Sequence, residues 1–262
     1  MLSEEWYVSE SMPRVSINMA MLEYLPPQDP WIDIVYQDES ILVVNKPSGL
    51  LSVPGRAPEH YDSMWSRLKV EFPDIQVVHR LDMSTSGVMV LALTKRAQKN
   101  LQQQFINRTI KKRYVALLER ELERKIESKT EITVDKISIQ GEINLPLRGD
   151  LEDRPRQLVC FEHGKQAKTQ WQIINTVAGK SKLYLYPETG RTHQLRVHCA
   201  HSKGLNTPIL GDDLYGSGTH SNGIYKLSSN EKPQRLHLHA QMLTLKHPVS
   251  KVVMTFETAE DF

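Results

Sequence analysis

The pattern of apolar and polar positions along the chain predicts more strands than helices. Apolar and polar residues alternate from 31 to 36, which is typical of a strand with one buried face, and 41–45 is more fully apolar. Residues 88–93 form the longest apolar run, so we expect a buried strand at 87–93. Similar patterns predict strands at 113–118, 168–175, 182–187, 235–245 and 252–257, and a weaker one at 131–139.

Helical spacing is found in fewer segments. Apolar residues recur at intervals of about four, as on one face of a helix, and predict helices over 63–72, 95–108 and 191–202. Because strands outnumber helices and do not alternate regularly with them, we expect an α+β fold with a mainly antiparallel sheet.

The chain is expected to form one domain after a short extension. Prolines 26, 27 and 30 favour extended backbone, so we assign 1–27 to an N-terminal extension and 28–262 to a single domain. The charged segment 119–156 is the hardest to assign, and the Gly/Ser-rich segment 217–230 is predicted to be a loop.

Composition is that of an ordinary globular protein, with 39% hydrophobic and 24% charged residues. The net charge of +2 does not by itself indicate a nucleic-acid partner, but the stretch from Lys95 to Arg113 holds seven Lys or Arg and no acid. Such a stripe is either a solvated helix face or a phosphate-binding surface. Two isolated cysteines, no signal peptide and no long apolar run fit a cytoplasmic protein that is not in a membrane.

The segment HRLDMSTSG, from His79 to Gly87, holds the first candidate for chemistry. Asp82 lies two residues after Arg80, so in extended backbone both side chains point to the same face. An acid at the edge of a core is partly dried and firmly held, which suits it for catalysis. The alternative is that Asp82 only accepts hydrogen bonds from turn amides.

Two further clusters contain cations and an aromatic residue. In TGRTHQLRVHCAHSKG, Arg196 lies in a predicted helix and could hold a catalytic carboxylate ionised, or could be a surface residue. Tyr114 follows three basic residues, where an aromatic ring can stack on a base or fill a core.

A metal site is a competing hypothesis. Zinc sites often use pairs of histidines on one helix face, and this chain has His193, His198, His201, His237 and His239. Their spacing gives no HExxH motif, and the chain has no G-x-S-x-G elbow and no glycine-rich phosphate loop. We therefore consider a metal-dependent hydrolase less favoured than an enzyme built around Asp82.

Six motifs together resemble one family, the RluA-type pseudouridine synthases. They are VVNKPSGLLSVPG, HRLDMSTSGVMVLALTK, KKRYVALL, TGRTHQLRVH, PILGD and LHLHA, in this order along the chain. The resemblance covers about residue 28 to the C-terminus. It implies a curved mixed sheet flanked by helices, a central RNA-binding cleft, and neither a metal nor an organic cofactor. It also implies that 28–262 is a pseudouridine synthase catalytic domain, and we expect no S4 RNA-binding domain before it.

The resemblance also implies roles for individual residues. Asp82 matches the nucleophile, Arg196 the arginine that pairs with it, and Tyr114 the tyrosine that stacks on the target uracil. Arg80 matches the residue that fills the space of the displaced base. The other residues assigned to RNA binding are His79, Lys46, Arg191, Lys95, Lys111, Lys112 and Arg113.

Within the family the chain looks most like the dual-specificity members. This implies a monomer whose partners are 23S rRNA and the tRNA anticodon stem-loop, with uridines 746 and 32 as the targets. The alternatives are a family member acting on another rRNA or tRNA uridine, and a catalytically silent RNA-binding protein or chaperone on the same scaffold.

Overall fold

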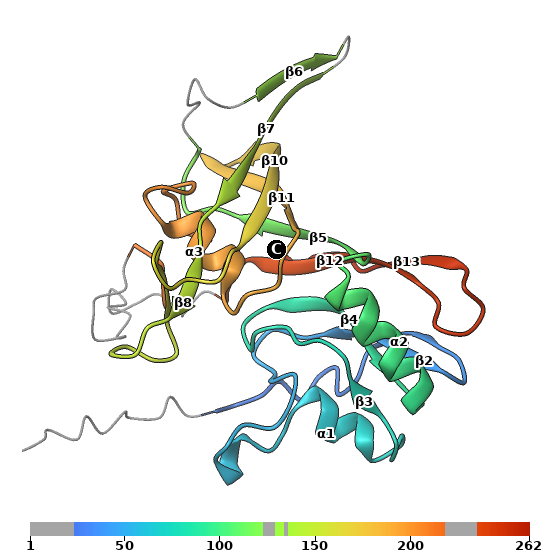
Figure 1. Cartoon of the computed structure of the whole chain (residues 1–262). Helices are drawn as coiled ribbons and strands as arrows, with labels where there is room; N and C mark the ends of the chain where they lie inside the picture. Colours follow the sequence, from blue (N-terminus) through green and yellow to red (C-terminus); the bar gives the residue numbers. More distant parts are fainter. Residues whose placement is uncertain (1–23, 123–128, 134–135, 218–234) are drawn as a thin grey trace, which may run out of the picture.

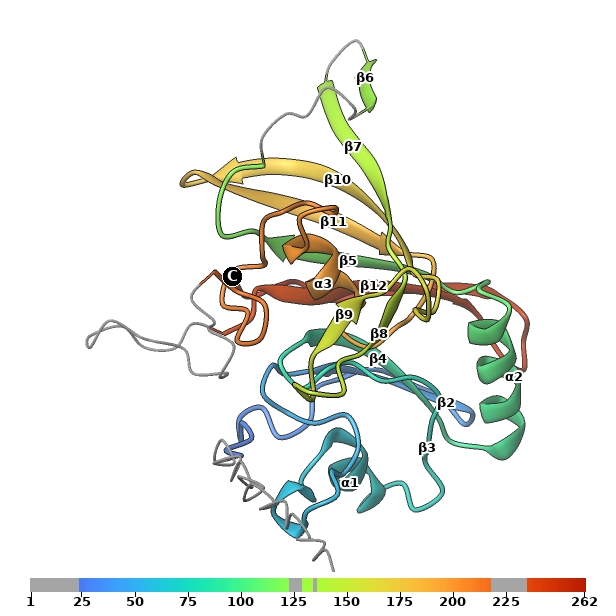
Figure 2. The same ribbon diagram turned by 60° about the vertical axis from the view of Figure 1, so that its left-hand side comes forward.

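The computed structural model describes residues 24–122, 129–133, 136–217 and 235–262. Within these residues one eleven-stranded sheet dominates, in the order β1-β2-β4-β12-β5-β11-β10-β7-β6, with β3 beside β4 and β13 beside β12 (Figures 1 and 2). The strands are β1 (Ile34–Gln37), β2 (Ile41–Lys46), β3 (Gln76–Val77), β4 (Ser86–Ala92), β5 (Lys111–Leu117), β6 (Lys129–Thr133), β7 (Lys136–Asn144), β10 (Lys168–Val177), β11 (Lys180–Pro187), β12 (Leu238–Lys246) and β13 (Val253–Glu257). A separate pair contains β8 (Leu147–Gly149) and β9 (Gln157–Val159).

Two helices cover opposite faces of β2 and β4. Helix α1 (Met64–Lys69) packs on a cluster that includes Leu42 and Met89, and α2 (Lys95–Ile106) packs on one that includes Val43 and Val90. Successive residues of a strand point to opposite faces, so neighbouring positions enter different cores. This double coverage explains why every residue of β4 is buried.

Side-chain hydrogen bonds cap the N-termini of these two helices. The Ser63 hydroxyl accepts from the Ser66 amide and the Ser66 hydroxyl accepts from the Ser63 amide, which caps α1. The Thr94 hydroxyl accepts from the Ala97 amide and caps α2. Beyond α2, Arg108 has a φ of 56°, which reverses the chain into β5.

The other half of the sheet has its own core. Leu195 and Cys199 of α3 (Gln194–Ala200) pack with Leu183 and Leu185 of β11. β10 and β11 join through a two-residue turn, Ala178-Gly179, in which both residues have positive φ, the geometry that a tight hairpin requires.

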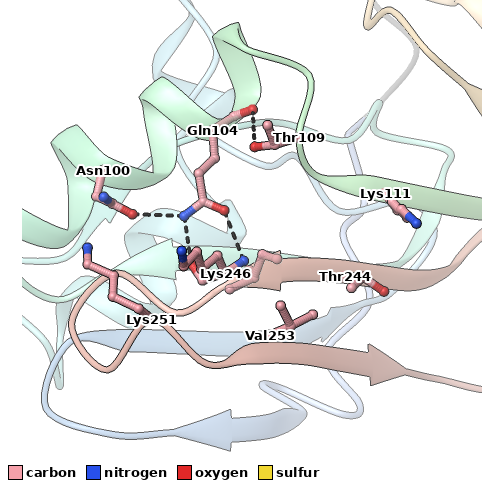
Figure 3. A pocket seen from close by; sticks show the side chains of 9 residues that line it. Asn100, Gln104, Thr109, Lys111, Thr244, Lys246, Lys251 and Val253 are labelled. Carbon is pink, nitrogen blue, oxygen red and sulfur yellow. Dashed lines mark hydrogen bonds between the residues drawn. The ribbon is translucent and has the colours of Figure 1, made fainter.

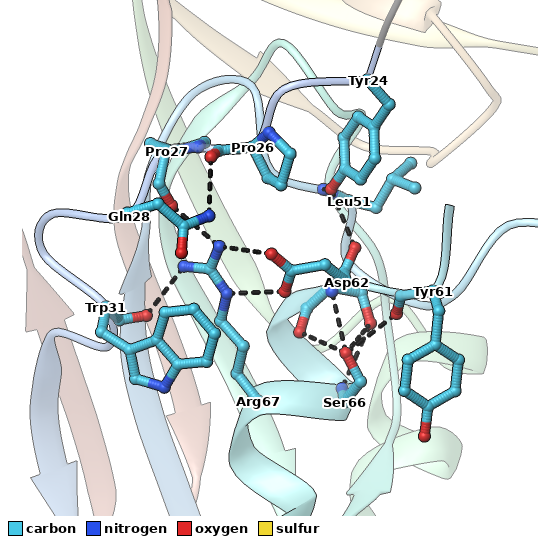
Figure 4. A network of polar contacts seen from close by, with 11 residues as sticks. Tyr24, Pro26, Pro27, Gln28, Trp31, Leu51, Tyr61, Asp62, Ser66 and Arg67 are labelled. Carbon is cyan, nitrogen blue, oxygen red and sulfur yellow. Dashed lines mark hydrogen bonds and ion pairs between the residues drawn. The ribbon is translucent and has the colours of Figure 1, made fainter. Parts of the chain in front are cut away.

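The segment before β1 is attached to α1 through Arg67 (Figure 4). The buried guanidinium of Arg67 forms a bidentate ion pair with Asp62 and donates to the carbonyl oxygens of Pro27 and Trp31. The Tyr24 hydroxyl donates to the Asp62 carbonyl and accepts from the Leu51 amide. Tyr24 and Pro27, which the sequence-based boundary assigns to the extension, therefore contact the domain.

The α+β prediction is confirmed, and the three helices occur where the periodicity indicates. The prediction that the third helix begins at Arg191 is wrong, because α3 begins at Gln194. The Gln194 side chain accepts from the Arg191 amide and the Thr189 hydroxyl, so residues 189–193 form a turn. The loop predicted at 217–230 falls almost entirely outside the described residues. No helix in the described part of the chain is long and apolar enough to span a membrane.

Candidate active site

Asp82 lies in the loop between β3 and β4, and this loop is attached firmly to the loop after β2. The Ser52 hydroxyl accepts from the Leu81 amide and donates to the Leu81 carbonyl at 2.6 Å. The Ser48 hydroxyl donates to the Ser84 carbonyl at 2.8 Å. Asp82 itself is half-buried, and its carbonyl accepts from the Thr85 amide. The carboxylate is therefore carried by a fixed backbone at the edge of the core.

Lys46, the last residue of β2, lies under this loop and is fully buried. Its ammonium donates to the carbonyl oxygens of Pro47, Leu50 and Met83 at 2.7–3.1 Å. Burial lowers the pKa of Lys46 to about 7, while the negative charge of Asp82 opposes this shift. The prediction that Lys46 binds RNA is wrong, because its donors are used to join the two loops.

Tyr114 approaches Asp82 from β5. Its backbone pairs with Ala240 of β12 on one side and Leu185 of β11 on the other. Its side chain packs against both the core under α3 and the core under α1. Burial and the negative charge of Asp82 raise the pKa of the phenol well above its ordinary value. Tyr114 therefore presents a protonated hydroxyl in the neighbourhood of Asp82, where the two halves of the sheet meet.

Arg196 is held by two acids other than the one that the sequence suggests. Its Nε and Nη2 donate to the fully buried Asp212 at 2.9 and 2.5 Å, and Nη2 also donates to Asp213. Asp212 accepts in addition from the amides of Leu214 and Tyr215. Asp82 contributes to the electrostatic environment of Arg196 without a direct ion pair. The expected pairing is corrected to a bidentate Arg196–Asp212 pair that acts on Asp82 through space.

His193 and Tyr215 complete the surroundings of Asp82. His193 precedes α3 with a φ of 51°, and its Nδ1 lies 2.8 Å from the Tyr215 hydroxyl. Burial lowers the pKa of His193, and Asp82 opposes this shift. The charge of Asp82 therefore acts on Lys46 of β2, Tyr114 of β5, Arg196 of α3 and His193 just before α3.

Among the other predicted RNA-binding residues, His79 has a structural role instead. Its Nε2 accepts from the Val90 amide at 3.0 Å, and its ring stacks on Phe105 with 4.7 Å between ring centroids. Burial and the charge of Lys112 lower the pKa of His79 to about 3, so the ring is neutral and adds no charge for a phosphate. His79 therefore has a structural role, and its assignment to RNA binding stays a prediction.

The remaining predicted cations divide into two groups. Arg80, Lys95 and Lys111 are exposed. The others donate to the protein: Lys112 to the Thr189 carbonyl, Arg191 to the Gln166 carbonyl, and Arg113 to Gln241 and Glu257.

Lys111 lines a hollow of about 500 Å³ between α2 and the β12–β13 hairpin (Figure 3). Its charged lining residues are all lysines, namely Lys111, Lys246 and Lys251. The Gln104 side chain connects α2 to β12 beside this hollow, because it donates to the Lys246 carbonyl as well as to Asn100. The sequence stripe therefore contributes to a basic hollow together with lysines from a distant hairpin.

The histidines considered as metal ligands have separate partners. His198 lies between Thr169 and the Leu145 carbonyl, while His237 contacts the carbonyl oxygens of Leu210 and Arg235. No cluster of three or more His, Cys, Asp or Glu side chains with metal-binding geometry occurs among the residues that the structure describes.

Sequence reasoning missed Asp212, Asp213 and Tyr215, and it considered His193 only as a metal ligand. All three missed residues lie in PILGDDLYG, of which only PILGD was used, as a family motif. Two adjacent acids before an aromatic residue are a weak signal, because such a pair is most often solvated.

Comparison with known proteins identifies the family of the chain. The family model for RNA pseudouridylate synthase matches residues 40–201. The dual-specificity RNA pseudouridine synthase RluA of Vibrio parahaemolyticus is 47% identical over 93% of this chain and 89% of its own length, and that of Escherichia coli K12 is 44% identical over 93% and 100%. Human RNA pseudouridylate synthase domain containing 1 superimposes with a TM-score of 0.64 at 30% identity, covering 88% of this chain and 84% of the human chain.

The chain therefore belongs to the RNA pseudouridylate synthase family. Within it, the chain is an RluA-type enzyme, an isomerase that converts uridine in RNA to pseudouridine.

Proposed function

We propose that Asp82 is the nucleophile of this isomerisation, with Tyr114 and Arg196 as its partners. The observation that carries the proposal is the position of Asp82, a half-buried carboxylate on a braced loop whose charge reaches side chains from three separate elements. A carboxylate can form a covalent intermediate and split one difficult step into two easier ones.

The isomerisation of uridine rearranges bonds within one nucleotide. The bond between uracil N1 and ribose C1′ breaks, the base turns, and a bond forms between C5 and C1′. C5 then loses its proton and N1 gains one, so no oxidant or energy source is consumed. Tyr114 is suited to stack on the base, and its raised pKa keeps the phenol protonated, so that its hydroxyl can act as a donor to the reacting base.

The target base must leave its stack, at a cost of a few kcal/mol that is smaller in a loop. We assign to Arg80 the role of filling the vacated space, since it is exposed two residues before Asp82. Exposed Lys95 and the lysines of the basic hollow are the candidates for backbone phosphate contacts.

The proposed substrates are a loop uridine of 23S rRNA, uridine 746, and uridine 32 of the tRNA anticodon stem-loop. The names of the relatives state dual specificity, which supports two RNA classes for this chain as well. The proposal includes a monomer that acts where these RNAs are, in the cytoplasm.

Asp82→Asn tests the central assignment. The variant should release no tritium from RNA labelled at uridine C5, while binding the same RNA with wild-type affinity. Asp74→Asn is the matched control, because Asp74 is an exposed acid just before β3. Full turnover by Asp82→Asn would show that another group is the nucleophile. A wild-type protein that binds RNA and releases no tritium would favour the silent RNA-binding alternative.

The substrates need a separate experiment. Pseudouridine mapping of total RNA, with and without the gene, should show loss at uridine 746 of 23S rRNA and uridine 32 of tRNA together. Loss at one position alone, or at other uridines, would contradict the dual assignment.

A further inference from the structure

The hydroxyl of Ser86 is the meeting point of two side chains from the C-terminal part of the chain. Ser86 is buried, begins β4 and lies four residues after Asp82 in the same motif. Arg235 Nη2 donates to its oxygen at 2.9 Å, and His239 Nδ1 lies 2.9 Å from the same oxygen. The end of the Asp82 loop is therefore fastened from the side of β12.

The hydrogen bonds of this group have one consistent direction. His239 Nε2 faces the carbonyl of Thr258 at 3.2 Å and its hydroxyl at 3.0 Å, and a carbonyl only accepts, so Nε2 carries a proton. Burial lowers the pKa of His239, which favours the neutral ring, so Nδ1 accepts from the Ser86 hydroxyl. Ser86 accepts in turn from Arg235. The network runs from Arg235 through Ser86 and His239 to Thr258.

Arg235 is held at its other end by the same C-terminal segment, residues 258–262. Asp261 forms an ion pair with Arg235 Nη1, and the Arg235 guanidinium lies 5.3 Å from the centre of the Phe262 ring. Glu260 attaches this segment to the sheet through Lys182 at 2.8 Å and Gln241 at 3.1 Å. In both views the C-terminus lies close to β5 and β12 (Figures 1 and 2).

We propose that Arg235, His239 and the segment 258–262 are positioning elements of the active site, which hold Ser86 and through it the loop that presents Asp82. The proposal rests on the proposed role of Asp82. Arg235 also lies near enough to Lys46 for its positive charge to lower the pKa of Lys46. It therefore acts both on Ser86 at the end of the loop and on the lysine beneath the loop. Arg235 Nε is buried without a hydrogen-bond partner, a cost that an apolar residue in the same place would avoid. The fixed direction of its Nη2 donor therefore explains an arginine at this position better than packing does.

The experiment compares Arg235→Ala, Arg235→Lys, Ser86→Ala and Asp261→Asn, using the labelled RNA on which the wild type releases most tritium. A misplaced reactive group lowers kcat and leaves substrate binding intact, so Arg235→Ala and Ser86→Ala should lose about tenfold or more in kcat with KM changed less than about twofold. Arg235→Lys, which keeps a charged donor but not the fixed direction of Nη2, should recover part of the loss. Asp261→Asn should lower kcat more mildly, because Asp261 is 67% exposed.

Glu142→Gln is the matched control, since Glu142 also pairs at the surface, with Lys168. It should leave kcat unchanged. Wild-type kcat in Arg235→Ala and Ser86→Ala would overturn the proposal. So would an Arg235→Lys variant no better than Arg235→Ala, or a rise in KM alone, which would indicate an RNA contact instead. If a thermal melt shows that Arg235→Ala is unfolded, Asp261→Asn tests the proposal in its place. Wild-type kcat in Asp261→Asn would then overturn the proposal. If Asp82 is the nucleophile, Asp82→Asn is inactive whether or not Arg235 and its partners position the loop. The nucleophile proposal and the positioning proposal can therefore fail independently of each other.

Discussion

Gly87 and Ala240 lie opposite each other where β4 and β12 pair in parallel, and their backbones are in close contact. A Cβ added to Gly87 would lie 2.3 Å from the Ala240 carbonyl oxygen and 2.6 Å from its nitrogen. Gly87 also has a φ of 116°, which side chains rarely adopt. Glycine therefore allows the strand after Asp82 to join β12.

Gly87→Ala should be strongly destabilising for this reason. Overpacking against fixed backbone together with an unfavourable φ predicts a loss of about 3–5 kcal/mol in the free energy of unfolding. Gly179→Ala is the control, because Gly179 has a φ of 73° and open space around it, so only about 1–2 kcal/mol is expected. Urea denaturation of both variants measures the difference, and equal losses would contradict the close contact.

The phenol of Tyr114 is expected to matter for turnover more than for stability. Removal of a positioned proton-transfer group typically costs about 10²–10⁴ in rate, so Tyr114→Phe should lower kcat within that range while RNA affinity is retained. Burial and Asp82 raise its pKa, so the hydroxyl stays protonated at pH values where a free tyrosine ionises. The wild-type pH profile should show no downturn near pH 10 from this group. Such a downturn, if absent from Tyr114→Phe, would disprove this environment.

The ion pair between Arg196 and Asp212 is predicted to contribute strongly to the stability of the fold. Breaking a buried pair leaves an uncompensated charge, at a cost of about 3–5 kcal/mol, so Asp212→Asn should be destabilised by that amount. Asp213→Asn should cost less than about 1 kcal/mol, because the Asp213 side chain is 45% exposed. Denaturant titration distinguishes the two, and a larger loss in Asp213→Asn would reverse the assignment.

Lys46→Met should change how stability depends on pH. Burial lowers the folded-state pKa of Lys46 to about 7, whereas an unfolded lysine keeps its proton up to about pH 10.4. Between these values the unfolded state binds more protons, so Lys46 makes the wild type gain stability as pH rises. The stability of wild type relative to Lys46→Met should therefore increase from pH 7 to pH 10. A difference that stays constant across this range would show that Lys46 keeps its proton in the folded protein.

The basic hollow should contribute to RNA affinity without contributing to chemistry. Replacing Lys111, Lys246 and Lys251 together with alanine should reduce the slope of log affinity against log salt by about 0.7 for each lost phosphate contact. The kcat value should stay at the wild-type level. Lys180→Ala, at the β10–β11 turn, is the control and should leave the slope unchanged. An unchanged slope in the triple variant would remove the hollow from the RNA-binding surface.

Much of the fold could be predicted because its signals are local. α2 was predicted at 95–108 and spans Lys95–Ile106, since its apolar face and its cap at Thr94 are both in the sequence. The start of α3 could not be predicted in this way. It depends on Gln194, whose side chain donates to the Lys168 carbonyl and the Thr169 hydroxyl on another strand.

The same limit applies to the site. Family motifs identified Asp82, Tyr114 and Arg196 as candidates, but the acid that binds Arg196 directly comes from 16 residues further along the chain. The role of Ser86 could not be predicted from the sequence, because its partners, Arg235 and His239, come from about 150 residues later. The order of the strands in the sheet determines which charged side chains lie close together. That strand order cannot be read from the order of the motifs along the chain.

The parallel pairing of β4 with β12 has a consequence for biosynthesis. Ser86 and His239 are 153 residues apart, so the end of the Asp82 loop lacks its neighbour on the β12 side until His239 has been translated. At roughly 5–20 residues per second this delay is about 8–30 s. A nascent chain that has already formed β2, β4 and α2 is thus expected to be catalytically inert. Enzyme activity should therefore arise only after β12 has been translated and has paired with β4.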